Sequence, residues 1–70
     1  MKAVSGKDFC RVLEKHGWVL KRKTKGSHFI YTRPNDPATI SVPVHGNKDL
    51  KKGLQADLMR QAGLTESDLS

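Results

Sequence analysis

Apolar positions near the start of the chain recur at the spacing of an α-helix, in the series Phe9, Val12 and Leu13, which His16 continues. Ser5 precedes this series and is a preferred N-cap residue, and Asp8 lies three positions later, as in a capping box. Gly17 follows the series and suits the left-handed conformation in which many helices end. The pattern therefore predicts a helix over residues 6–16.

Three segments in the middle of the chain are rich in strand-forming residues and are separated by turn residues. The first covers residues 18–24 and the second residues 28–33, with a hairpin turn at 25–27 between them. The sequence Pro-Asn-Asp-Pro at positions 34–37 is a second turn signal. It separates off the third segment, residues 38–44, in which apolar residues alternate, so that one face of this strand is expected to be buried.

The C-terminal third predicts a second helix after a loop at residues 45–49. Apolar residues again recur at helical spacing, in the series Leu54, Leu58, Met59 and Ala62. Gly63 is suited to end this helix. Residues 65–68 carry the polar side chains that can cap one further helical turn, or else the tail frays.

This order of helix, strand, strand, strand and helix predicts an α+β fold in a single domain that covers residues 1–70. A three-stranded antiparallel sheet with both helices on one face is the simplest arrangement that buries both apolar stripes. A domain of this order and size has the shape of the double-stranded-RNA-binding domain.

Composition indicates the kind of partner. The formal net charge of +6 and the pI near 9.8 favour a polyanion, nucleic acid first, with an acidic protein as the competing interpretation. The sequence has no apolar run of membrane-spanning length and no signal-peptide pattern, so we expect no membrane association and a cytoplasmic location. The single cysteine, Cys10, is expected to be a small buried residue of the first helix.

The most basic stretch of the chain ends on His28, at the start of a predicted strand, and has Gly26 and Ser27 as turn residues. Its cations are Lys21, Arg22, Lys23 and Lys25. Imidazole titrates near neutrality, so His28 could take a proton from a ribose 2′-hydroxyl, which then attacks the adjacent phosphorus. The cations would contact phosphates and stabilise the charge of the transition state. RNA cleavage is thus one hypothesis, and a histidine that merely begins a strand is the other.

Acid–base catalysis usually needs a second group, and His45 is the first candidate because the second and third strands are predicted neighbours. Tyr31, Ser27 and Lys48 are weaker candidates. The seven carboxylates are scattered over different elements and the three histidines lack ligand-like spacing, which disfavours a metal nuclease. We therefore predict no metal and no other cofactor.

A non-catalytic double-stranded-RNA-binding module is the alternative function, because a domain of this order and size can read the shape of an RNA backbone. Lys51 and Lys52 precede the second predicted helix, where positive charge and the helix dipole suit phosphate contacts. Product formation separates the two hypotheses, since a binding module shifts RNA in a gel and leaves it intact.

Residues spread in order along nearly the whole chain resemble the HicA (YcfA-like) toxin family. The matching segments are Gly26-Ser27-His28, Ile30-Tyr31, Pro34, Val42-Pro43-Val44-His45, Lys48, Leu50, Lys52-Gly53 and Gln61-Ala62-Gly63-Leu64. The resemblance implies a fold like that of the double-stranded-RNA-binding domain and the toxin of a type II toxin–antitoxin system. It implies an mRNA interferase, an endoribonuclease that arrests translation, with His28 of the Gly-Ser-His motif as its catalytic histidine.

The same resemblance implies two partners, mRNA and a HicB-like antitoxin that masks the site. The chain departs from the family at one position. Family members often carry Thr after the Lys-Gly pair, where it can cap the second helix, and this chain has Leu54. A weak N-cap is therefore expected for the second helix.

Overall fold

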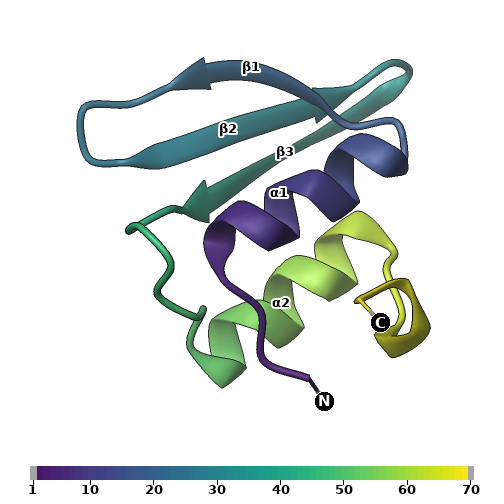
Figure 1. Cartoon of the computed structure of the whole chain (residues 1–70). Coiled ribbons are helices and arrows are strands. Elements are labelled where there is room, and N and C mark those ends of the chain that lie inside the picture. Colours follow the sequence, from purple (N-terminus) through teal and green to yellow (C-terminus); the bar gives the residue numbers. More distant parts are fainter. Residues whose placement is uncertain (1, 70) are drawn as a thin grey trace.

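The computed structural model describes residues 2–69, and its three strands form one antiparallel sheet in the order β1-β2-β3. The elements are α1 (Gly6–Lys15), β1 (Val19–Lys23), β2 (His28–Arg33), β3 (Asp36–Pro43), α2 (Lys52–Ala62) and a 3₁₀ helix, η1 (Glu66–Leu69). Both helices lie against one face of the sheet (Figure 1). The predicted α+β fold and element order are confirmed, whereas the likeness to the double-stranded-RNA-binding domain stays a prediction. Among the described residues, no helix has the length and apolar character needed to cross a membrane.

The signals at both ends of α1 are confirmed. The hydroxyl oxygen of Ser5 accepts a hydrogen bond from the backbone N–H of Asp8 at 3.1 Å, and Gly17 adopts a φ of +90° directly after the helix. The carboxylate of Asp8 accepts a hydrogen bond from Arg11 at 3.3 Å, so it does not complete the capping box. Ser5 alone therefore provides the side-chain cap.

Both hairpin turns form where predicted, and the second is shorter than predicted. In the first turn the residue with left-handed geometry is Ser27, with a φ of 65°, and not Gly26. In the second, Pro34 and Asn35 form a two-residue turn, and Asn35 takes a φ of 64°, a region that Asn tolerates better than most residues. Since this turn is shorter than predicted, β3 begins at Asp36, two residues early.

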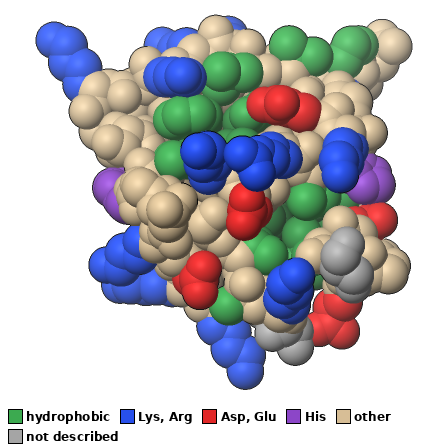
Figure 2. Space-filling model, viewed as in Figure 1, with side chains coloured by type: hydrophobic (Ala, Val, Ile, Leu, Met, Phe, Trp, Pro, Cys, Tyr) green, Lys and Arg blue, Asp and Glu red, His purple; other side chains and the backbone are tan. Residues whose placement is uncertain are grey.

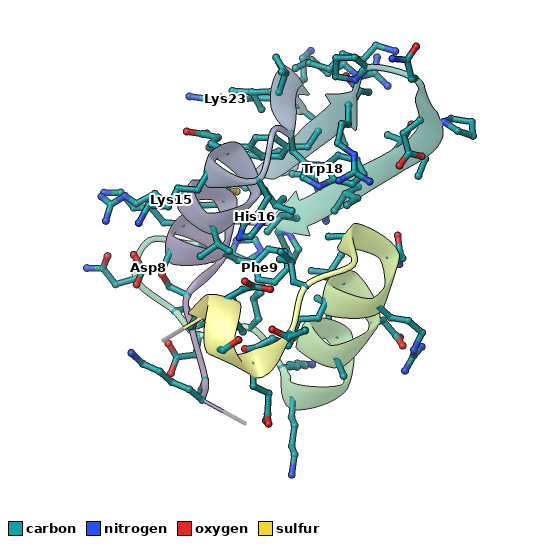
Figure 3. All side chains as sticks on the ribbon, turned by 90° about the vertical axis from the view of Figure 1, so that its right-hand side faces the viewer. Asp8, Phe9, Lys15, His16, Trp18 and Lys23 are labelled. Atoms are coloured by element: carbon teal, nitrogen blue, oxygen red, sulfur yellow. The ribbon has the colours of Figure 1, made fainter. Side chains whose placement is uncertain are left out.

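The hydrophobic core lies between the sheet and the helices. Its largest fully buried apolar side chains are Trp18, Tyr31, Phe9, Leu13, Ile40 and Val42. In Figure 3, Phe9 lies on the inner side of α1, whereas Asp8 and Lys15 point outward. On β2, Tyr31 and the partly buried Phe29 pack into this core, so His28 is presented on the opposite face of the sheet.

A buried amide joins the N-terminal segment to α2, and this contact was not predicted. The Gln55 side chain is 1% exposed; its oxygen accepts from the backbone N–H of Val4 at 3.1 Å, and its nitrogen donates to the carbonyl of Lys2 at 2.6 Å. The backbone N–H of Leu50 donates to the carbonyl of Val4 at 2.9 Å. These bonds hold the segment that leads into α2 against the N-terminal segment.

Helix α2 begins without a side-chain cap. Lys51 occupies the N-cap position and its side chain makes no capping hydrogen bond. This agrees with the weak N-cap that the sequence predicts. Leu54 is not at the cap but inside the first turn, because the helix begins at Lys52. Gly63 ends the helix with a φ of 70°, as predicted.

The tail forms the additional helical turn that the sequence allowed. Asp68 accepts a hydrogen bond from the backbone N–H of Thr65 at 2.7 Å, and Leu69 is buried in the core. Nε2 of His16 lies 3.5 Å from the Asp68 carboxylate, which joins η1 to the end of α1. Cys10 is buried as predicted, and burial raises the pKa of its thiol.

Candidate functional site

The turn between β1 and β2 is held by hydrogen bonds that centre on Thr24. Its backbone N–H donates to the carbonyl of His28 at 2.8 Å, and its hydroxyl accepts from the N–H of His28 at 3.2 Å. Its carbonyl accepts from the N–H of Ser27 at 3.2 Å, and the carbonyl of Ser27 accepts from Val44 at 2.9 Å. The backbone at His28 is therefore fixed both to its own turn and to the end of β3.

The imidazole of His28 is exposed and lies against Gly26. A Cβ placed at Gly26 would lie 3.5 Å from Nδ1 of His28, which is ordinary van der Waals contact. Across the sheet, His28 stands opposite Pro43 of β3. The site therefore has an open titratable group on one side of a short turn, with a proline as its cross-strand neighbour.

The predicted cations surround the turn but do not share one face. Arg22 pairs with Ile30, which lies on the same face as His28, whereas Lys23 pairs with Phe29 on the face that carries the helices. Nζ of Lys23 lies 4.8 Å from the centre of the Phe29 ring, within the range of a cation–π contact. The register shifts between Leu20 and Arg22, so Lys21 lies at an irregularity of β1.

All four predicted cations of this hairpin are exposed, including Lys25 in the turn. Figure 1 places the β1–β2 turn, the end of β3 and the start of α2 at the left of the molecule, and Figure 2 shows Lys and Arg side chains at the upper and lower corners of that side. Lys51 and Lys52 are also exposed, and the first turn of α2 carries no acidic residue. Positive charge therefore lies both at the hairpin and at the N-terminus of α2.

Of the candidates for a second catalytic group, Tyr31 is contradicted by the structure. Its side chain is 1% exposed, and its hydroxyl donates to the Glu14 carboxylate at 2.6 Å. Burial and this carboxylate raise the pKa of Tyr31, so the hydroxyl neither reaches substrate nor ionises readily. The tyrosine instead joins β2 to α1.

His45 is exposed in the loop after β3, two residues beyond Pro43, the cross-strand neighbour of His28. Both histidines thus lie at the same end of the sheet, so His45 is still the candidate for the second catalytic group. His45, Pro43 and Lys48 line a shallow depression of about 390 Å³ between the end of β3 and the start of α2. Among the described residues, no three His, Cys, Asp or Glu side chains gather as a metal site.

Sequence reasoning missed two parts of this region. Thr24 was not singled out, although Ser and Thr hydroxyls commonly bond to nearby backbone in turns, and this signal could have found it. The depression between β3 and α2 was also missed. It is lined by Pro43 and by residues two to eleven positions further along the chain, and no local pattern predicts how this loop and the start of α2 lie against the end of β3.

The fold and this region define a class: a small basic α+β domain that presents an exposed histidine among cations at one end of its sheet. The family model for the HicA toxin of bacterial toxin–antitoxin systems matches residues 6–64. This range covers most of the chain, so the protein belongs to the HicA family. Members of this family are toxins that pair with an antitoxin. No curated protein is significantly similar to the chain.

Proposed function

We propose that this HicA-family protein is an mRNA interferase, an endoribonuclease that cleaves RNA in the cytoplasm and thereby inhibits translation and growth. The observation that supports the proposal most directly is the exposed imidazole of His28, whose backbone is held by hydrogen bonds to Thr24 at a turn that is surrounded by cations. Family membership supports the toxic role.

The chemistry assigned to this site is transfer of the phosphoryl group to a ribose 2′-oxygen. His28 takes the proton from the 2′-hydroxyl, the 2′-oxygen attacks the adjacent phosphorus, and the bond to the leaving 5′-oxygen breaks. His45 is the candidate acid that protonates this leaving oxygen. Arg22, on the face of His28, and Lys25, in the turn, stabilise the negative charge that develops on the phosphorus oxygens.

Phosphate contacts are assigned to the cations on both sides of the site, namely Lys21, Arg22, Lys23, Lys25, Lys51 and Lys52, with the backbone of Gly26 and Ser27 at the turn. Each contact with single-stranded RNA should contribute about 0.7 to the slope of log affinity against log salt. Removing Arg22 should lower this slope by that amount. An affinity that barely changes with salt would remove these residues from the interface.

The direct test is incubation of the purified protein with RNA in EDTA. We expect cleavage, products that end in a 2′,3′-cyclic phosphate, and no cut at a nucleotide that lacks its 2′-hydroxyl. A gel shift with fully intact RNA would instead identify a non-catalytic double-stranded-RNA-binding module. Activity that is lost in EDTA and restored by a divalent ion would contradict metal independence.

The antitoxin of this pair is proposed to be HicB-like and to act by covering the site. A net charge of +6 favours an acidic covering surface. A carboxylate against His28 would keep the imidazole protonated and unable to act as a base. Amide exchange of the complex should show protection at residues 26–28 with little change in the core. A complex that leaves this turn open and still binds RNA would contradict the proposal.

A further inference from the structure

The depression between β3 and α2 is lined in part by His45, the candidate acid, and it begins at the cross-strand neighbour of His28. Pro43 stands opposite His28 in the β2–β3 pair and also lines the depression. Side chains directly opposite each other in an antiparallel pair lie on the same face with Cβ atoms about 5 Å apart. The depression therefore begins beside His28, and we expect an RNA chain bound at His28 to place a neighbouring nucleotide over it.

The lining of the depression is mainly apolar. Pro43, Leu50 and Leu54 contribute carbon surface, and Leu54 is one of two large apolar side chains that remain exposed among residues 2–69, at 37%. Leu50 is held in place by the backbone bond from its N–H to the carbonyl of Val4. A surface of this kind suits the flat face of a heterocycle and offers little to a phosphate.

The depression is lined by side chains of both positive and negative charge. Asp49 lines it with a carboxylate that takes part in none of the side-chain hydrogen bonds or ion pairs found between described residues. Lys48 and Lys51 also line it. A carboxylate at this position disfavours a phosphate and accepts hydrogen bonds from the exocyclic amino groups of A, C and G. The single N3–H of uracil lies between two carbonyl oxygens, which a carboxylate repels. The lysines can contact the phosphates on either side of the base.

We propose that this depression binds the base of the nucleotide next to the scissile phosphate, and that Asp49 selects bases with an exocyclic amino group over uracil. The proposal rests on the proposed function for the presence of RNA and adds a subsite that gives the cleavage its sequence preference. Single-stranded RNA bases are typically recognised in this way, splayed from the chain with their edges hydrogen-bonded to the protein.

The test uses 2′-O-methyl trinucleotides of A, C, G or U, which cannot be cleaved by 2′-oxygen attack and so allow the wild-type protein to be used. We titrate each into ¹⁵N-labelled protein and follow the backbone amides. The expected result is saturable shifts at residues 49–51 and 54, with U binding roughly tenfold more weakly than the others, the order of discrimination expected for one base-edge contact. Inorganic phosphate at the same ionic strength should not reproduce these shifts.

Two variants with matched controls test the assigned contacts. An amide donates as well as accepts, so Asp49→Asn should reduce the difference between A and U to less than about threefold. Asp57→Asn, an equal charge change at an exposed position on α2, should leave it unchanged. Leu54→Ala should weaken the binding of all four trinucleotides roughly tenfold, whereas Val19→Ala, which also truncates an exposed apolar side chain, should leave their binding unchanged.

The outcomes are distinguishable from those that test the proposed function. Shifts confined to residues 25–28, equal affinity for all four trinucleotides, or an Asp49→Asn protein that discriminates like wild type would overturn the subsite. The same outcomes, with unmodified RNA still cleaved, would leave the proposed function intact. Base-dependent binding at residues 49–54 without any cleavage would contradict the nuclease and support the subsite.

Discussion

Gly6 lies where the backbone of α1 packs closely against the backbone at the end of β3. A Cβ at this position would overlap the carbonyl oxygen of Pro43 and would lie 3.1 Å from its carbonyl carbon and 3.2 Å from Cα of Val44. All three atoms belong to the backbone, so no side-chain rotation can relieve the overlap. Gly6→Ala would therefore force the helix away from the end of β3.

The magnitude follows from two opposing effects. Overpacking a close contact typically costs 1–3 kcal/mol, and the upper half of this range applies because only backbone can move. Replacing Gly by Ala recovers about 0.4–1 kcal/mol, since the unfolded chain loses conformational freedom. We expect a net loss of about 2 kcal/mol in the free energy of unfolding, or roughly 10 °C in Tm for a domain of this size.

Gly53 provides the matched control, because it also lies in the first turn of a helix but a Cβ there meets no atom within 4 Å. Gly53→Ala should raise the stability by about 0.4–1 kcal/mol. Urea denaturation followed by circular dichroism measures both variants. A Gly6→Ala protein that is as stable as wild type would refute the close contact between α1 and β3.

Two further predictions concern hydrogen bonds. Tyr31→Phe loses the bond to Glu14 and should lower the free energy of unfolding by about 1.5 kcal/mol in urea denaturation. Because the pKa of Tyr31 is raised on folding, the wild type should also lose stability as the pH rises above about 10. An equal loss of stability with pH in Tyr31→Phe would count against this bond. The backbone N–H of Ala38 and the Arg33 guanidinium lower the pKa of Asp36, so its contribution is present above the ordinary carboxyl pKa and is lost as the pH falls below it. The urea midpoint should therefore fall between pH 5 and pH 2 by more in wild type than in Asp36→Ala, and parallel curves would contradict this assignment.

The helices, strands and element order could be predicted because their signals are local and periodic. Ser5 and Gly17 mark the ends of α1 within a few residues of its apolar face, and the sheet order follows from two short turns. The sequence does not indicate which residue of the first turn takes a positive φ, and the structure shows that it is Ser27, although the turn also contains Gly26. The bonds of Gln55 to the N-terminal segment span more than fifty residues, and no local pattern reports them.

The site was predictable as a set of residue types and less so as a geometry. His28 and its cations stand out in the sequence, but only the strand register shows that Arg22 shares the face of His28 while Lys23 lies over Phe29. Tyr31 is a reasonable candidate by chemistry and is excluded only by its burial. Burial and facing depend on which side of the sheet the helices cover, and alternation along a strand does not give that choice.

The catalytic role of His28 is the central claim, and the rate of RNA cleavage in EDTA by two histidine variants tests it most directly. His16 is the matched control, because it is also exposed but lies at the end of α1, paired with Asp68, on the opposite side of the molecule from the β1–β2 turn (Figure 1). With folding of each variant checked by circular dichroism, His28→Ala should lose at least about a hundredfold in rate and His16→Ala should cleave like wild type. A folded His28→Ala protein that cleaves RNA at the wild-type rate would contradict the account.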